Sequence, residues 1–352
     1  MVSSPTTSKY AALLRQQYAP RGVYAGASHF RDVWARDAFF ASFGCIGIGE
    51  VAHARDTVQF FLDHMRHDGL VPIRIGAKDQ VLNYLKLSFR HGAVYTQDKG
   101  RNHAVDPNLL LLILADAVER AGGKRFNRAE LACVAHWIVA RLGADGLLHQ
   151  GPYADWEDSI KTRGSRLYTS VCLARALRAA ATLLNDKTYA KRATTVERAV
   201  QSWWTGTYFM DGPRELRFMT AGNLLAIIWG IATKQQAQSI LKRLARRTTV
   251  CPPSGYFKPS IRSVYAPFFL IGLADYHASM EWSWLAPLEA LAYDAVGEKI
   301  EASHRRERFD ALVQKHSSVF EVYEHDVPVN RIVYRSERDF GWAIGIRCAK
   351  TL

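Results

Sequence analysis

The spacing of apolar residues predicts a chain that is helical almost throughout. Apolar side chains recur every three or four positions in successive stretches, which places them on one face of a helix. Roughly a dozen helices of ordinary length are expected. They span about 33–47, 50–66, 107–121, 128–142, 167–184, 187–204, 220–232, 235–246, 265–277, 283–296 and 297–315, with a last helix near 338–348.

Alternation typical of strands is confined to short pieces, such as GLVPIRI at 69–75 and parts of 319–335. The expected fold class is therefore all-α. A dozen consecutive helices with short connections suggest hairpins closed into a ring, which is an (α/α)6 toroid, or six-hairpin barrel, with a few short strands in its loops. An open helical solenoid is the alternative, but the chain shows no residue-level repeat.

In such a ring the inner helices are apolar on all sides and the outer helices on one face only. The stretches 106–118 and 220–232 fit inner helices, whereas 186–204 and 234–247 fit outer ones. No linker rich in Gly, Ser or Pro divides the chain. We therefore expect a single domain over 1–352, whose first 25 residues (1–25) form an N-terminal lead-in segment.

Composition narrows the functional class. The chain has 352 residues, of which 48% are hydrophobic, enough for a large core. It contains no run of about 18 apolar residues and no secretory signal pattern, so we expect a cytoplasmic protein without a membrane partner. The five cysteines form no metal-type or redox-type pair and are expected to be buried reduced thiols. GCIGIGE at 44–50 lacks a phosphate-loop context, and no metal or other cofactor is expected.

The chain is strongly basic, with 46 Lys and Arg against 33 Asp and Glu, a formal charge of +13. These charges are scattered among apolar positions, and no nucleic-acid-binding motif accompanies them. A basic solvated surface is expected rather than a nucleic-acid site. An anionic substrate or surface remains open, and so does the oligomeric state.

Carboxylates and aromatic rings collect just before several expected inner helices. Such a combination suits a sugar, because its C–H face packs on a ring while its hydroxyls need directed donors and acceptors. The expected partner is therefore a small sugar or oligosaccharide. The candidate residues in these positions are Trp34, Arg36, Asp37, Asp106, Asp155, Trp156, Asp158, His277, Trp282 and Glu321.

Each candidate also has a purely structural interpretation. Asp37 and Asp106 fit the N-cap position of a helix. Arg36 beside Asp37 fits a structural ion pair, Trp282 fits the core, and a single His277 fits a hydrogen-bonding role. It is the recurrence of an acid with an aromatic ring at one end of several helices that favours a binding site.

Five segments occur in an order that resembles a known family. DVWARDAFFAS, VDPNLLLLILADA, FMTAGNLLAIIWGIATKQQAQSIL, YHASMEWSWL and FEVYEHD are similar to the successive signature segments of neutral/alkaline invertases. DWEDS resembles the Trp-Met-Asp segment of the amylo-α-1,6-glucosidase domain of glycogen debranching enzymes. The resemblance covers about 30–345. It implies an (α/α)6-toroid glycosidase that acts with inversion at the anomeric carbon.

The resemblance also implies roles for individual residues. It places the general acid at Asp158 and the general base at Glu321. Arg36 and Asp37 match the segment that binds the sugar at the point of cleavage. The positions that match residues lining or supporting that pocket are Asp106, Asn223, His277 and Trp282.

Departures from the invertase pattern bear on the substrate. The expected Val-Asp-Ser-Gly-Leu-Trp-Trp is VDPNLLL here, and Tyr-His-Asn-Gly is YHAS. The resemblance therefore favours hydrolysis of a terminal α-glucosidic bond, with a sucrose-cleaving invertase as a close alternative. From other classes, a non-hydrolytic carbohydrate-binding toroid and a sugar-epimerising toroid, with Tyr276 or His277 as base, stay open because a fold alone does not fix an activity.

An inverting glycosidase needs one protonated carboxyl and one ionised carboxylate on opposite faces of the sugar. An Asp is a poor acid at neutral pH unless its pKa is raised. We expect Asp155 and Glu157 to raise the pKa of Asp158 by like charge, and Trp156 to reduce its solvation. The cations expected to point away from it are Lys161, Arg163 and Arg166.

Overall fold

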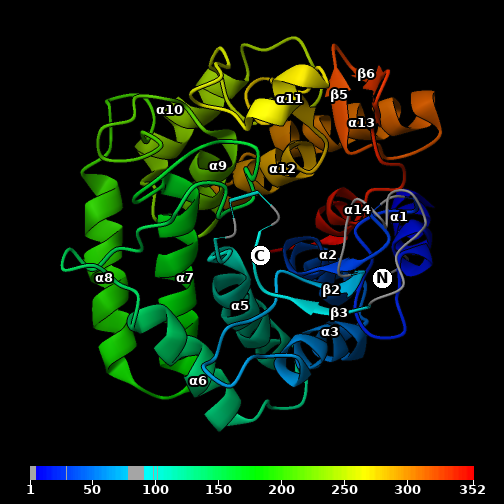
Figure 1. The fold of residues 1–352 in the computed structure, drawn as a ribbon. Helices are drawn as coiled ribbons and strands as arrows, with labels where there is room; N and C mark the ends of the chain where they lie inside the picture. Colours follow the sequence, from blue (N-terminus) through cyan, green and yellow to red (C-terminus); the bar gives the residue numbers. More distant parts are fainter. Residues whose placement is uncertain (1–4, 29, 78–90, 98, 101) are drawn as a thin grey trace.

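The computed structural model describes residues 5–28, 30–77, 91–97, 99–100 and 102–352. Within these ranges the chain is rich in helices and its strands are two to four residues long, which confirms the predicted helical class. Figure 1 shows helices arranged around a common centre, with a second set outside them.

Six of the described helices contact one another in a closed ring. Each inner helix contacts the next along the chain, and the last one returns to the first. In chain order they are α2 (Ala35–Gly47), α5 (Asp106–Arg120), α7 (Leu167–Leu183), α9 (Thr220–Ile228), α12 (Leu285–Ala295) and α14 (Gly341–Cys348).

The outer helices each pack on one or two members of this ring (Figure 1). They are α1 (Pro5–Gln16) on α14, α3 (Val51–Asp63) on α2 and α5, α6 (Arg128–Val139) on α5 and α7, α8 (Lys187–Gln201) on α7, α10 (Lys234–Leu244) on α9 and α13 (Lys299–His316) on α12. The predicted inner stretches form α5 and α9, and the predicted outer stretches form α8 and α10.

The structure contains one helix that the sequence did not predict, and one predicted helix is much shorter. Helix α1 lies within 1–25, and its Tyr10, Ala11 and Leu14 are buried. The helix expected over 265–277 is reduced to α11 (Ala266–Leu270), which has no buried residue. Gly272, in the left-handed region at φ 69°, follows directly, so the chain turns before a second helical turn can form.

The ring closes where α14 crosses α2, and glycines make that crossing possible. A Cβ on Gly44 of α2 would lie 2.3 Å from the carbonyl oxygen of Gly345. A Cβ on Gly345 of α14 would lie 2.2 Å from the Cα of Ala41. Both distances are impossible for a side chain, so the two backbones can approach this closely only because neither position carries one.

Short antiparallel strands lie in the loops. One sheet has the order β1–β2–β3, with β1 (Val33–Trp34), β2 (Arg74–Ala77) and β3 (His91–Val94). A second has the order β4–β5–β6, with β4 (Glu281–Trp282), β5 (Val322–Glu324) and β6 (Val327–Pro328). A two-stranded sheet pairs β7 (Asn330–Arg331) with β8 (Tyr334–Arg335). In the second sheet Trp282 is opposite Val322, which brings two remote segments together.

Several outer helices begin with side-chain caps. Asn127 accepts from the backbone N–H of Ala129 at the start of α6, and Asp186 accepts from that of Thr188 at the start of α8. Asp37 and Asp106 are not caps, because the N-cap positions are Trp34 and Val105 and no side-chain cap bond forms there. The capping interpretation of these two aspartates is therefore wrong.

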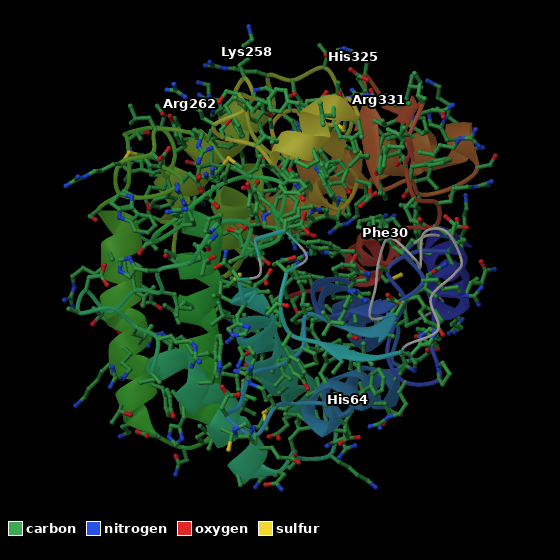
Figure 2. The ribbon with its side chains drawn as sticks, viewed as in Figure 1. Phe30, His64, Lys258, Arg262, His325 and Arg331 are labelled. Atoms are coloured by element: carbon green, nitrogen blue, oxygen red, sulfur yellow. The ribbon has the colours of Figure 1, made fainter. Side chains whose placement is uncertain are left out.

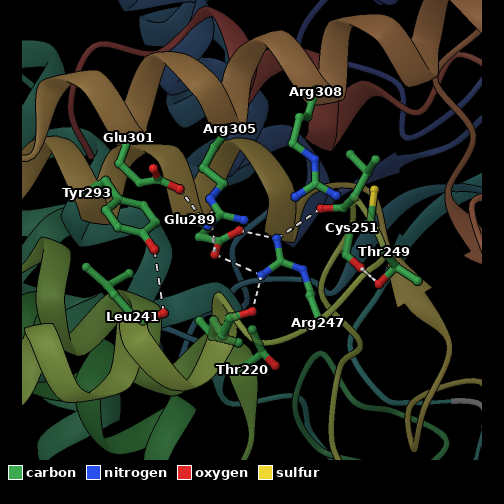
Figure 3. A network of polar contacts seen from close by, with 12 residues as sticks. Thr220, Leu241, Arg247, Thr249, Cys251, Glu289, Tyr293, Glu301, Arg305 and Arg308 are labelled. Carbon is green, nitrogen blue, oxygen red and sulfur yellow. Dashed lines mark hydrogen bonds and ion pairs between the residues drawn. The ribbon is translucent and has the colours of Figure 1, made fainter.

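A buried charge network joins α12 to the segment after α10 (Figure 3). The carboxylate of Glu289 is fully buried and pairs with both terminal nitrogens of Arg247. Arg247 also donates to the carbonyl oxygens of Leu244 and Val250. Arg305 of α13 lies 3.9 Å from Glu289. This network fixes the end of α10 against α12 and α13.

The surface is basic and the thiols are mostly inside. Figure 2 shows Lys258 and Arg262, both exposed, extending from the edge of the molecule. Four of the five cysteines are buried and free, and Cys133 is exposed, so the prediction of buried thiols fails at that position. Among the described residues, no helix combines the length and apolarity that a membrane span requires.

Candidate active site

A cavity of about 480 Å³ brings together most of the residues singled out from the sequence. Both Asp158 and Glu321 line it, although 163 positions separate them in the chain (321 − 158). Their companions in the lining include Trp34, Arg36, Asp37, Trp156, His277 and Trp282. The volume falls within the range of small-molecule sites.

The DWEDS segment is fixed by contacts on either side of Asp158. The carboxylate of Asp155 accepts from Gln150 Nε2 at 2.6 Å and from the backbone N–H of Glu157 at 3.0 Å. Glu157 accepts from Ser254 Oγ at 2.6 Å. These two acids face the protein interior, which leaves Asp158 directed into the cavity.

The charge environment of Asp158 differs from the prediction. Lys99 Nζ lies 2.8 Å from Asp158 Oδ1, and the Arg36 guanidinium lies 3.5 Å from Oδ2. Burial raises the pKa of Asp158, but the positive charges of Lys99 and Arg36 lower it below its ordinary value. The expectation that neighbouring acids raise this pKa is therefore wrong.

The predicted orientation of the nearby cations holds in part. Lys161 and Arg163 are exposed, as expected. Arg166 is buried and pairs with Asp211 at 3.4 Å, so it points inward and not to solvent. The two cations that reach Asp158 come from other segments of the chain.

Glu321 lies far from Asp158 in the sequence, and two tyrosines hold its carboxylate. Tyr276 donates to Oε1 at 2.7 Å and Tyr334 donates to Oε2 at 2.6 Å. The backbone oxygen of Glu321 accepts from the N–H of Ser283, and the backbone N–H of Glu321 donates to the backbone oxygen of Glu337. A bond to each carboxylate oxygen fixes the orientation of the Glu321 carboxylate in the cavity.

Asp37 lies in the first turn of α2, is buried and lines the same cavity. Burial raises its pKa to about 7; the positive charge of Arg36 opposes this rise, and the negative charges of Glu321 and Asp158 add to it. Arg36 itself donates to the backbone oxygen of Asp155 at 3.0 Å and pairs with Asp106 at 3.6 Å. Arg36 thus connects the start of α2 to the DWEDS segment.

Aromatic rings form the floor of the site. His277 and Trp282 are stacked with centroids 4.7 Å apart and planes 9° apart. Trp156 meets both rings edge to face. Trp282 lies in strand β4 and donates through Nε1 to the backbone oxygen of Tyr276 at 2.8 Å. Trp282 is buried, as a core residue would be. It also lines the cavity, where a ligand can contact it.

Among the described residues that line the cavity, four buried nitrogen atoms have no hydrogen-bond partner: Trp34 Nε1, Gln97 Nε2, His277 Nε2 and Trp342 Nε1. The other ring nitrogen of His277 is 2.7 Å from Ser159 Oγ. Burial lowers the pKa of His277 to about 3, so the imidazole is neutral. Because buried polar atoms normally have partners, these nitrogens are positions where a ligand rich in hydroxyls can bind.

Three of the predicted site residues do not line the cavity. Asp106 accepts from Tyr168 and pairs with Arg36, and Asp155 anchors the DWEDS segment. Asn223 donates to and accepts from the backbone of Phe209, at 3.1 and 3.0 Å. These residues support the walls of the site rather than face the cavity.

Sequence reasoning missed several members of the lining, among them Lys99, Phe268, Tyr334 and Trp342. None of these residues lies beside a recognisable motif, so only the folded chain brings them to the site. No group of three or more His, Cys, Asp or Glu side chains in the described ranges is arranged to hold a metal ion.

Comparison with known families confirms the resemblance to amylo-α-1,6-glucosidases. The profile of that family, described as amylo-alpha-1,6-glucosidase, matches residues 6–89, a range that includes Arg36 and Asp37 but neither Asp158 nor Glu321. No curated protein matches the chain. The family match supports a glycosidase-type enzyme and leaves its substrate open.

Solved structures of glycosidases share the fold. Mannosylglycerate hydrolase from Thermus thermophilus is 13% identical, with a TM-score of 0.69 over 98% of this chain and 99% of that one. A rhamnosidase from Klebsiella oxytoca, solved with rhamnose bound, is 13% identical, with a TM-score of 0.71 over 99% of this chain and 64% of that one. Identities this low establish a common fold only.

Proposed function

We propose that this chain is an (α/α)6-toroid glycoside hydrolase that cleaves a terminal α-glucosidic bond of a small sugar or oligosaccharide with inversion. One observation carries the proposal. Two carboxyl groups from remote segments, Asp158 and Glu321, line a single cavity with aromatic walls and unpartnered nitrogen donors. The closed ring of helical hairpins and the sugar-cleaving proteins of the same fold support it.

In the proposed reaction the sugar lies on the Trp156 and Trp282 rings, and its hydroxyls meet Asp37 and the unpartnered nitrogens. Asp158 gives a proton to the glycosidic oxygen as the bond from that oxygen to the anomeric carbon breaks. Glu321, oriented by its two tyrosine hydroxyls, takes a proton from the water that attacks the anomeric carbon from the opposite face.

Asp37 is a second candidate for the general acid. It lines the same cavity, and its pKa of about 7 keeps much of it protonated at neutral pH, whereas the pKa of Asp158 is lowered. The two assignments differ in the effect of the leaving group. Only loss of the true acid is relieved by an activated leaving group, which departs without a proton.

A hydrolysis screen tests the proposed function. Sucrose, maltose, isomaltose, trehalose and kojibiose are incubated with the wild type and with Asp158→Asn/Glu321→Gln, and released glucose is measured. We expect the wild type to hydrolyse at least one glucoside other than sucrose and the double variant to release none. Hydrolysis of sucrose alone would instead identify an invertase. Sugar binding by calorimetry without any turnover would identify a carbohydrate-binding protein.

A further inference from the structure

Lys99 occupies a position in the cavity that the proposed reaction does not explain. Its ammonium group lies 2.8 Å from Asp158 Oδ1 and 4.8 Å from the centre of the Phe268 ring. Both Lys99 and Phe268 line the cavity. The carboxylate of Asp158 therefore lies between Lys99 and Arg36.

This arrangement opposes the role proposed for Asp158. A carboxyl group flanked by two cations favours the ionised form, and an ionised carboxylate has no proton to donate. Substrate binding must therefore draw at least one of the two cations away before the bond is cleaved.

Lys99 is the cation that can move. Arg36 is buried and fixed by the backbone oxygen of Asp155 and by the carboxylate of Asp106. Lys99 has a flexible four-carbon stem, a side chain that is 22% exposed, and Asp158 as its charged partner. An anion on the substrate can compete for the Lys99 ammonium without disturbing α2.

The side of the cavity on which Lys99 lies indicates which part of the substrate it meets. The leaving group departs on the side of the general acid, and Lys99 and Phe268 are on that side because Lys99 contacts Asp158 directly. The Phe268 ring offers a face for the leaving group, and the ammonium offers a charge-assisted hydrogen bond.

We propose that Lys99 determines specificity by binding a carboxylate carried by the leaving group, so that the preferred substrate is an acidic glucoside, such as one whose leaving unit is a uronic acid. This inference rests on the proposed function, because it assigns the leaving-group side from the role of Asp158. A carboxylate fits the position, since the ammonium already binds one there, that of Asp158.

The exchange restores the chemistry of Asp158. When the substrate carboxylate pairs with the Lys99 ammonium, Arg36 is the one close cation left beside Asp158, and Asp158 binds a proton from solvent. That proton then passes to the glycosidic oxygen, the electron pair of the broken C–O bond stays on this oxygen, and the leaving unit departs as an alcohol. Water supplies the new C–O bond, and its released proton goes to Glu321.

A matched pair of substrates tests the proposal. Maltose is compared with its analogue in which the C6 hydroxymethyl group of the leaving unit is oxidised to a carboxylate. The enzymes are wild type, Lys99→Met, Lys99→Arg and the control Lys161→Met, which removes an exposed lysine near the same segment. The measured quantity is the ratio of kcat/KM for the acidic substrate to that for maltose, which cancels general effects of each variant.

We expect this ratio to fall about 10- to 100-fold in Lys99→Met, the range for a hydrogen bond between charged groups. Lys99→Arg should restore part of it, and Lys161→Met should leave it unchanged. An unchanged ratio in a folded Lys99→Met that still cleaves maltose would overturn the role of Lys99 and leave the glycosidase proposal intact.

A binding measurement decides the matter even without turnover. Free glucuronate and free glucose are titrated into the wild type and Lys99→Met by calorimetry. The wild type should bind glucuronate at least about tenfold more tightly than Lys99→Met does, and the two proteins should bind glucose alike. Equal affinity of the two proteins for glucuronate would overturn the proposal, whatever the enzyme hydrolyses.

The pH profile separates this role from a merely structural one. The charged and titratable groups around Asp158 are Lys99, Arg36, His277, Asp37, Asp106 and Tyr276. Removing only Lys99 should raise the pKa of Asp158, so the basic limb of kcat/KM on maltose should move to higher pH in Lys99→Met. A basic limb that stays in place would show that Lys99 does not act on Asp158.

Discussion

Asp37→Asn is expected to make the protein more stable at alkaline pH and less active. The Asp37 side chain is buried, and burial is the main reason that its pKa rises from 3.8 to about 7. Below about pH 4 the carboxyl is protonated in both the folded and the unfolded chain, so it carries no penalty there. Between pH 4 and 7 the unfolded chain ionises first, and the native state loses stability as pH rises through the folded pKa.

The magnitude follows from the size of the rise. A difference between 3.8 and about 7 corresponds to about 4 kcal/mol at full ionisation, since one pKa unit is 1.36 kcal/mol. The neutral amide of Asn has no such penalty. Asp37→Asn should therefore match the wild type near pH 4 and exceed its free energy of unfolding by up to about 4 kcal/mol at pH 8.

Urea unfolding of both proteins between pH 4 and 8.5, followed by circular dichroism, measures this difference. Asp186→Asn is the control, because Asn keeps the cap at the start of α8 and this exposed site should show no pH-dependent gap. The kcat/KM of Asp37→Asn should fall about 10- to 100-fold, because the carboxyl group proposed to bind a sugar hydroxyl is lost. A variant that is less stable at pH 8, or equally active, would refute the reasoning.

Two further substitutions probe the core and the floor of the site. Glu289→Gln should lower the free energy of unfolding by about 3–5 kcal/mol, because Arg247 would be left as a buried charge without a counter-ion. The control Glu197→Gln, in a more exposed pair with Arg178, should lower it by less than about 1 kcal/mol. Chemical denaturation compares the two variants, and equal effects would contradict the buried-pair argument. Trp282→Ala should lower the free energy of unfolding by about 3–5 kcal/mol and also weaken sugar binding, which calorimetry measures. Normal sugar affinity in the folded variant would place this ring outside the sugar site.

The helical class and the inner and outer helices could be predicted from the sequence, because the positions that a helix buries carry apolar residues at regular spacing. The stretch 106–118 is apolar on all sides and forms inner helix α5, and 234–247 is apolar on one face and forms outer helix α10. No helix was predicted at α1, although Tyr10 and Leu14 have helical spacing.

The site could be predicted only in part. Asp158, Glu321, Arg36, Asp37 and the aromatic residues near them lie in segments that resemble known motifs, and the fold brings them to one cavity. The electrostatics of Asp158 could not be predicted, because Lys99 lies 59 positions away and meets it only in the folded chain. Adjacent acids in the sequence turned out to point into the protein, where Gln150 and Ser254 hold them.

The stereochemistry of the first product tests the central claim most directly. Proton NMR follows the anomeric signals during the first minutes of hydrolysis of an α-glucoside, before mutarotation mixes them. If Asp158 is the acid and Glu321 activates water, the first glucose released is the β-anomer. Asp158→Asn should keep more activity on an activated leaving group than on a disaccharide, and Glu321→Gln should lose both activities. Initial release of the α-anomer would contradict the account, because it requires a retaining route in which Glu321 is not a base for water.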